Sequence, residues 1–249
     1  MEAVKPVVFF HVMKCGGTSV RAGLAQGIAD DPAGPDVFEL DGQIALEAAG
    51  GLHAENWRFR DSLLLYVLLA DQPKLVLGHV RYRDRYTDYL DRFHFVTVLR
   101  DPVERFISLY QYRRYKEGVD VPVSGSFEDF IDKPRWQKEG HAYVEVFCGR
   151  DDLDRRSDAA VEAAVENLGR FEVVGFTDQL DRFATDVGSC VGREVHIPRL
   201  NKSPAPDDDR EISAELLART HEICAPDIAL FEAMIRDRSA AQPPENSMS

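Results

Sequence analysis

Long apolar runs are missing from this 249-residue sequence. No stretch approaches the roughly 18 uninterrupted apolar residues of a membrane-spanning helix, since even residues 63–70 are bordered closely by Arg60 and Asp71. The apolar segment that follows Pro6 is too short for the core of a secretory signal. We therefore expect no membrane span and a cytoplasmic location.

Paired cysteines are missing as well. The four cysteines stand far apart and form no CxxC pair: Cys15, Cys148, Cys190 and Cys224. This spacing suits reduced thiols better than a disulfide framework or a zinc site. We expect four free thiols and no structural metal.

Basic residues are in deficit, and the formal net charge is −13. A surface of that sign repels nucleic acids and anionic membranes, so neither is an expected partner. An anionic ligand would need a local basic pocket, and residues 81–116 supply a candidate with nine basic residues against five acidic ones. Taken alone, that segment is equally typical of a solvated helix face.

Apolar runs typical of β-strands alternate with helical patterns along the chain. Strands are expected at residues 7–12, 74–78, 94–99 and 171–176. Helices are expected at residues 18–28, 58–70, 102–116, 127–131, 141–148, 158–168, 178–191, 212–224 and 226–236. The alternation predicts an α/β, three-layer fold with a central, mostly parallel sheet flanked by helices. We expect one domain over residues 1–238 and a frayed tail over 239–249.

The segment after the first strand has the parts of an anion-binding loop. It reads His11-Val12-Met13-Lys14-Cys15-Gly16-Gly17-Thr18-Ser19 and leads into a helix. The glycines allow close backbone approach, while the lysine, the hydroxyls and the helix N-terminus attract a phosphate or sulfate group. Lys14 precedes the two glycines, whereas a Walker A loop places its lysine after them. That order argues against a kinase or an ATPase.

A second candidate anion site follows the strand at 94–99. Arg100 leaves the strand end with a fork of N–H donors suited to a phosphate. Asp101 and Pro102 are suited to the N-cap and the first position of the next helix. Ser108 lies two helical turns further on and can add a hydroxyl contact.

Three histidines lie in or beside the expected strands. His79 follows the strand at 74–78 and stands in a Gly-His-Val segment. An imidazole at a strand end can accept a proton near neutral pH, so we predict that His79 is a catalytic base. His11 and His94 are expected to be hydrogen-bonded core histidines.

These segments together resemble the PAPS-dependent sulfotransferases, and in particular the carbohydrate branch that resembles heparan sulfate 2-O-sulfotransferase. The loop resembles the family's PKxGGTS motif, with Met13 in place of the proline. Residues 95–110, FVTVLRDPVERFISLY, resemble the strand and helix that bind the 3′-phosphate. Residues 77–80 resemble the GHV segment, 174–180 a family turn, and 200–203 a late loop that closes over the nucleotide.

The resemblance implies a P-loop-NTPase-like fold, with 3′-phosphoadenosine-5′-phosphosulfate (PAPS) as co-substrate, 3′-phosphoadenosine-5′-phosphate (PAP) as product, and no metal. It implies His79 as base and Lys14 at the bridging oxygen. The implied nucleotide contacts are Lys14, Cys15, Gly16, Gly17, Thr18, Ser19, Arg100, Ser108, Lys202 and Ser203. The acceptor would be a hydroxyl on a carbohydrate, a glycolipid or a small metabolite, and a neutral acceptor suits the acidic chain better than a polyanion.

Two other functions stay open at this point. A divergent nucleotide-dependent kinase would need a Walker-type lysine and a magnesium-binding carboxylate. A non-catalytic module that binds a phosphorylated ligand would tolerate the loss of His79, whereas an enzyme would not. Neither the acceptor nor the oligomeric state follows from the sequence.

Overall fold

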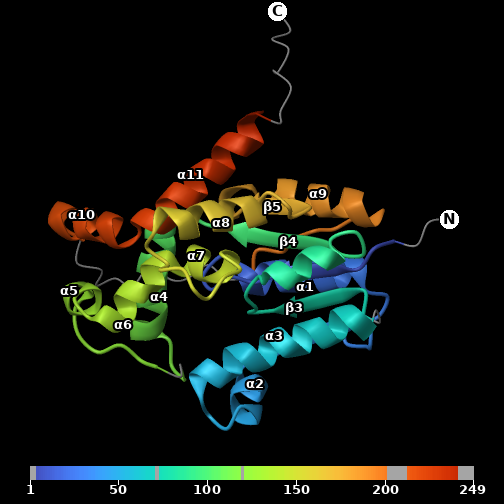
Figure 1. Ribbon diagram of the computed structural model, residues 1–249, viewed down its shortest axis with the longest axis horizontal. Helices are drawn as coiled ribbons and strands as arrows, with labels where there is room; N and C mark the ends of the chain where they lie inside the picture. The colour runs from blue at the N-terminus through green and yellow to red at the C-terminus, as the bar shows by residue number, and fades with distance from the viewer. Residues whose placement is uncertain (1–3, 71–72, 119–120, 201–211, 241–249) are drawn as a thin grey trace, which may run out of the picture.

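A parallel β-sheet forms the centre of the molecule (Figure 1). The computed structural model describes residues 4–70, 73–118, 121–200 and 212–240, with the side chains of 53–55 and 239–240 left aside. The described sheet has five strands in the order β2-β3-β1-β4-β5, and every pairing is parallel. The predicted α/β class is confirmed.

The chain alternates between strands and helices. The strands are β1 (Val7–Phe10), β2 (Val37–Leu40), β3 (Leu75–Gly78), β4 (His94–Leu99) and β5 (Val173–Phe176). The α-helices are α1 (Gly17–Ile28), α2 (Gly42–Ala48), α3 (His53–Ala70), α4 (Pro102–Tyr115), α5 (Phe127–Ile131), α6 (Pro134–Gln137), α7 (Ala142–Phe147), α8 (Asp158–Leu168), α9 (Leu180–Val191), α10 (Ala214–Ile223) and α11 (Ala225–Ala240). Short 3-10 helices are η1 (Asp84–Tyr89), η2 (Lys138–His141) and η3 (Thr177–Gln179).

Two helical layers cover the sheet because successive strand residues point to opposite faces. Val7 and Phe9 pack against α1 and α9 on one face. Val8 and Phe10 pack against α3, α7, α8 and α11 on the other. A third apolar cluster lies among α4, α5 and α6. This is the predicted three-layer arrangement.

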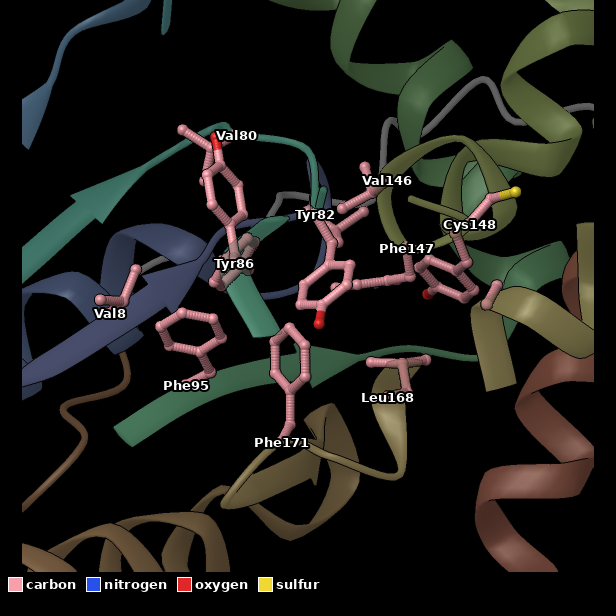
Figure 2. Packing of buried hydrophobic residues seen from close by; sticks show 14 of the residues in the cluster. Val8, Val80, Tyr82, Tyr86, Phe95, Val146, Phe147, Cys148, Leu168 and Phe171 are labelled. Atoms are coloured by element: carbon pink, nitrogen blue, oxygen red, sulfur yellow. The ribbon is translucent and has the colours of Figure 1, made fainter. Parts of the chain in front are cut away.

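Aromatic side chains fill the core beneath the loop that follows β3 (Figure 2). The ring of Phe171 lies 5.0 Å from Phe10 and 5.8 Å from both Phe95 and Tyr82, between ring centroids. Val80 and Tyr82 are both buried, and the Tyr82 N–H donates to the Val146 carbonyl at 2.7 Å. These anchors hold the chain on the carboxyl side of His79.

Several predicted boundaries are confirmed and others are wrong. β4, α5 and α8 have the predicted bounds, and Asp101 caps α4 by accepting from the Glu104 N–H at 2.9 Å. The first strand ends at Phe10 rather than at residue 12, and α3 begins at His53 rather than at residue 58. β2 and α2 were not predicted from the sequence. β2 forms the sheet edge and buries only Leu40, so it lacks the apolar run that marks a buried strand.

The predicted thiols are confirmed, since all four cysteines are free. Among the described residues, no helix is long and apolar enough to cross a membrane. α11 continues to Ala240, and residues 241–249 lie outside the described part of the chain.

Candidate active site

The predicted site residues meet at the carboxyl edge of three neighbouring strands. Lys14 follows β1, His79 follows β3 and Arg100 follows β4, and β1 lies between the other two strands. The strand order reverses between β1 and β4, because the chain fills one side of β1 before it crosses to the other. Ligands of open parallel sheets bind at such a point.

The loop after β1 delivers the N-terminus of α1 to this edge. The Cys15 N–H donates to the Val12 carbonyl at 3.4 Å, and Gly16 then takes a positive φ of 70° at the N-cap. The first N–H groups of a helix have no partner within it, so the backbone of Gly17, Thr18 and Ser19 is available to an anion. The Thr18 side chain is exposed, while Ser19 is buried.

Gly17 is required by the imidazole of His11. A Cβ added at Gly17 would lie 1.6 Å from His11 Nε2, so no larger residue fits without moving that ring. His11 itself is only half-buried and stacks on both Phe9 and His79. The sequence predicted a core histidine, but the half-buried His11 ring forms part of the wall of the site.

Replacing Gly17 by alanine should destabilise the fold by about 1–3 kcal/mol, because the His11 ring must leave a packed position. Urea unfolding would measure the change. The matched control is Gly169→Ala, where the added Cβ would find its nearest neighbour at 3.4 Å. Equal midpoints for the two variants would show that the His11 ring is not held in place by this packing.

Lys14 has an unusual backbone and a defined neighbourhood. Its φ of 71° makes it the only non-glycine residue with a positive φ among those described. Its Nζ lies 4.3 Å from the centre of the Tyr112 ring on α4. Burial, followed by the charges of Arg100 and Lys116, lowers the pKa of Lys14. Left-handed conformations of residues with a Cβ are concentrated at functional sites, and this one turns the ammonium toward the Arg100 side.

Tyr143 on α7 joins the two predicted anion sites, and nothing in the sequence marked it. Its hydroxyl accepts from the Arg100 N–H at 2.9 Å and donates to the Arg100 carbonyl at 2.6 Å. The same oxygen lies 3.4 Å from Cys15 Sγ. Burial raises the pKa of both the Tyr143 phenol and the Cys15 thiol. The Cys15 side chain thus faces the interior, and only its backbone can face a ligand.

Two buried charged residues, Arg105 and Asp227, lie around Tyr143. Arg105 is 0% exposed, donates to the Glu139 carbonyl, and lies with its guanidinium 5.6 Å from the Tyr143 ring centre. The Asp227 carboxylate accepts from the N–H groups of Tyr143 and Val144. Burial raises the pKa of Asp227 to about 7, against the opposing charge of Arg105. These contacts fix α7 against α4 and α11.

His79 is held in one tautomer by the backbone. Its Nδ1 lies 2.7 Å from the His11 carbonyl, and because a carbonyl only accepts, Nδ1 carries the proton. The two imidazole rings stack with their centroids 4.0 Å apart. Burial lowers the pKa of His79 to about 4, with a smaller contribution from Arg60. At neutral pH the ring is therefore uncharged, and Nε2 is left as a proton acceptor.

Arginines surround His79 on the side of α3. Arg60 is 5% exposed and donates to the His79 carbonyl at 2.7 Å. The guanidinium groups of Arg60 and Arg81 lie 4.1 and 4.4 Å from the Trp57 ring centre. Arg81 pairs with Glu145 at 2.8 Å, so a carboxylate balances its charge. Trp57 and Arg60 were not predicted, because a helical pattern shows which residues are apolar but not which lie beside a histidine in another element.

Arg100 comes just before α4, and Ser108 lies within that helix. Arg100 Nε and Nη2 both donate to Glu104 at 3.2 Å, and Ser108 follows Glu104 by one helical turn. Glu104 is exposed, so its carboxylate can move away from Arg100 when a stronger anion arrives. The structure places Arg100 close enough to influence the ammonium of Lys14 electrostatically.

A cleft of about 370 Å³ opens beside Arg100. Its walls come from the start of α4, the end of β5 and η3, and the last turns of α11. Thr177 lines this cleft and also lies within 4 Å of a Cβ position at Gly16. Thr177 therefore lies between this cleft and the loop after β1. Among the described residues, no group of three or more His, Cys, Asp or Glu side chains is arranged to hold a metal ion.

Other predicted residues are not brought together. Lys202 and Ser203 lie outside the described residues, although the Leu200 N–H donates to Ser19 Oγ at 3.1 Å, next to the loop. The basic segment 81–116 does not form one pocket. Arg105 lies in the core, Arg81 and Arg83 form ion pairs near α3, and Arg100 alone of these faces the cleft.

The solved structures similar to this chain include two sulfotransferases. No family model and no curated protein matches this chain. The chain is similar to a sulfotransferase from Alicyclobacillus acidocaldarius, with 18% identity and a TM-score of 0.45, over 93% of this chain and 96% of that one. It is also similar to the mouse sulfotransferase SULT7A1 complexed with PAP, with 11% identity and a TM-score of 0.41, over 92% of this chain and 65% of that one. The function proposed below is inferred from the residues of this chain.

Proposed function

We propose that the protein is a PAPS-dependent sulfotransferase that transfers a sulfuryl group to an acceptor hydroxyl. The observation that carries this proposal is the meeting of Lys14, His79 and Arg100 at adjacent strand ends, next to the N-terminus of α1. In-line transfer of a sulfuryl group between two oxygens requires a base and positive charge. The neutral imidazole with its free Nε2 supplies the base, and the ammonium and the guanidinium supply the charge.

Each group has a role in this reaction. The acceptor oxygen attacks the sulfur atom, and its proton passes to His79 Nε2. The bond between sulfur and the bridging oxygen breaks, and Lys14 stabilises the negative charge that this oxygen gains. The backbone N–H groups at the start of α1 hold the 5′-phosphosulfate, while Arg100 and Ser108 hold the 3′-phosphate.

The acceptor belongs to the carbohydrates, glycolipids or small hydroxylated metabolites in this proposal. The charges near His79 support a weakly charged acceptor, since Arg81 pairs with Glu145 and Arg83 pairs with Asp61 at 2.7 Å. A polyanion would compete with these carboxylates and with the negative charge of the whole chain.

Calorimetric titration with PAP and with ATP plus Mg²⁺ tests the donor site. The parental protein should prefer PAP, and Arg100→Ala should bind PAP about 10- to 100-fold more weakly, because a charge-assisted fork of hydrogen bonds is lost. The control is Arg92→Ala, at the opposite end of β4, which should bind like the parental protein. A preference for ATP would instead support the kinase, and PAP binding without sulfuryl transfer to any acceptor would support the binding module.

A further inference from the structure

Arg238, near the end of α11, is an arginine whose hydrogen-bond donors are not all satisfied among the described residues. Its side chain is 17% exposed, and its guanidinium lies 5.2 Å from the centre of the Phe176 ring. Nη1 and Nη2 are both buried and find no hydrogen-bond acceptor in the described part of the chain. The carboxylate paired with it, that of Asp186, is 3.8 Å away, which is too far for a hydrogen bond.

Such an arrangement is costly for a folded protein. Buried donors on a charged group lose their water, and an acceptor normally replaces it. The guanidinium is also near another cation, Arg182, and both burial and this neighbour lower the pKa of Arg238. An arginine held in this way gains hydrogen bonds and loses repulsion when an anion reaches it.

The cleft beside Arg100 gives an anion that access. Arg238 lines the same 370 Å³ cleft, together with Phe231 and Ile235 of its own helix. Arg100 lines it from the link between β4 and α4, and Glu104 lines it from α4. The guanidinium groups of Arg100 and Arg238, from separate elements, therefore reach one space, which Arg182 of α9 also lines. Each offers a planar fork of N–H donors, which is the geometry that recognises a phosphate.

We propose that Arg238 is a second arginine for the 3′-phosphate of the nucleotide, so that Arg100, just before α4, and Arg238, on α11, bind one terminal phosphate monoester between them. This inference rests on the proposed function, and it adds a contact from the C-terminal helix that neither nucleotide motif contains. The sequence pattern ended this helix at residue 236, so Arg238 lay outside the predicted helix, although the helix continues to Ala240.

The test compares two nucleotides that differ only in the 3′-phosphate. PAP and AMP are titrated into the parental protein, Arg238→Met, and the control Arg236→Met. Arg236 lies on the same helix but is 69% exposed and pairs with Glu232 across the helix surface. Arg238→Met should weaken PAP about 10- to 100-fold and leave AMP within about twofold. Arg236→Met should change neither affinity.

The outcomes separate this inference from the proposed function. Equal losses for PAP and AMP, or no loss in Arg238→Met, would overturn the role of Arg238 while PAP binding by the parental protein still stands. A folded parental protein that binds neither nucleotide would overturn the proposed function itself. Arg238→Lys provides a second variant that keeps the cation. It should lose part of the preference for PAP over AMP, because an ammonium lacks the fork of donors.

Discussion

Replacing Lys14 by methionine should lower kcat for sulfuryl transfer about 100- to 1,000-fold while the KM for PAPS changes little. The ammonium is proposed to act on charge that appears at the bridging oxygen only as the bond to sulfur breaks, and loss of one such donor costs on that order. Methionine keeps an unbranched side chain of similar bulk but removes the ammonium that lies over the Tyr112 ring. Steady-state kinetics at varied PAPS concentration would measure both parameters.

Lys116 supplies the matched control for Lys14. Its Nζ lies 5.0 Å from the centre of the same Tyr112 ring, but Lys116 is exposed and follows α4 rather than β1. Lys116→Met should therefore keep kcat within about threefold, because removing an exposed charge has a small effect. If the two variants lost the same activity, Lys14 would only add to the general positive field around Tyr112.

Replacing His79 by glutamine should lower kcat about 100- to 10,000-fold, the usual contribution of a positioned general base. Binding of PAP should not change, because the ring lies on the β3 side of the loop and the nucleotide cleft lies on the β4 side. The control is His94→Gln, at the amino end of β4, where the imidazole lies 3.2 Å from Glu172. A His79 variant with parental kcat would exclude the residue as the base.

The pH dependence follows from the lowered pKa of His79. Because this pKa is about 4, the base is in its active, neutral form throughout pH 5.5–8, and kcat/KM should fall only as the pH drops toward about 4. Stability changes in the same direction. Between the unfolded value of 6.5 and the folded value, only the unfolded chain takes up the proton, so the free energy of unfolding falls as the pH is lowered. A break in the rate profile near pH 6.5 in folded protein would contradict the buried, neutral base.

The sequence predicted the parts of the site that lie at strand ends. β4 was predicted with its observed bounds because its sequence alternates and is β-branched. His79 and Arg100 directly follow their strands, and Lys14 follows β1 within four residues, so the parallel sheet brings all three to one edge. Lys202 and Ser203 are still predictions, since they lie outside the described residues.

What the sequence did not predict depends on contacts between distant elements. Tyr143 stands in a helical segment among other apolar residues, and only the packing of α7 places its hydroxyl on Arg100 and Cys15. Arg60 and Trp57 likewise lie at the site only because α3 packs beside His79. A periodic pattern shows the face that a helix buries, but not the element that it meets.

A single phenol oxygen couples the two ends of the proposed nucleotide site. The Tyr143 hydroxyl contacts Cys15 in the loop after β1 and both backbone groups of Arg100. Neither segment can shift without breaking a contact to that oxygen. In the proposed complex, Tyr143 therefore fixes the distance between the two phosphate sites without touching either phosphate.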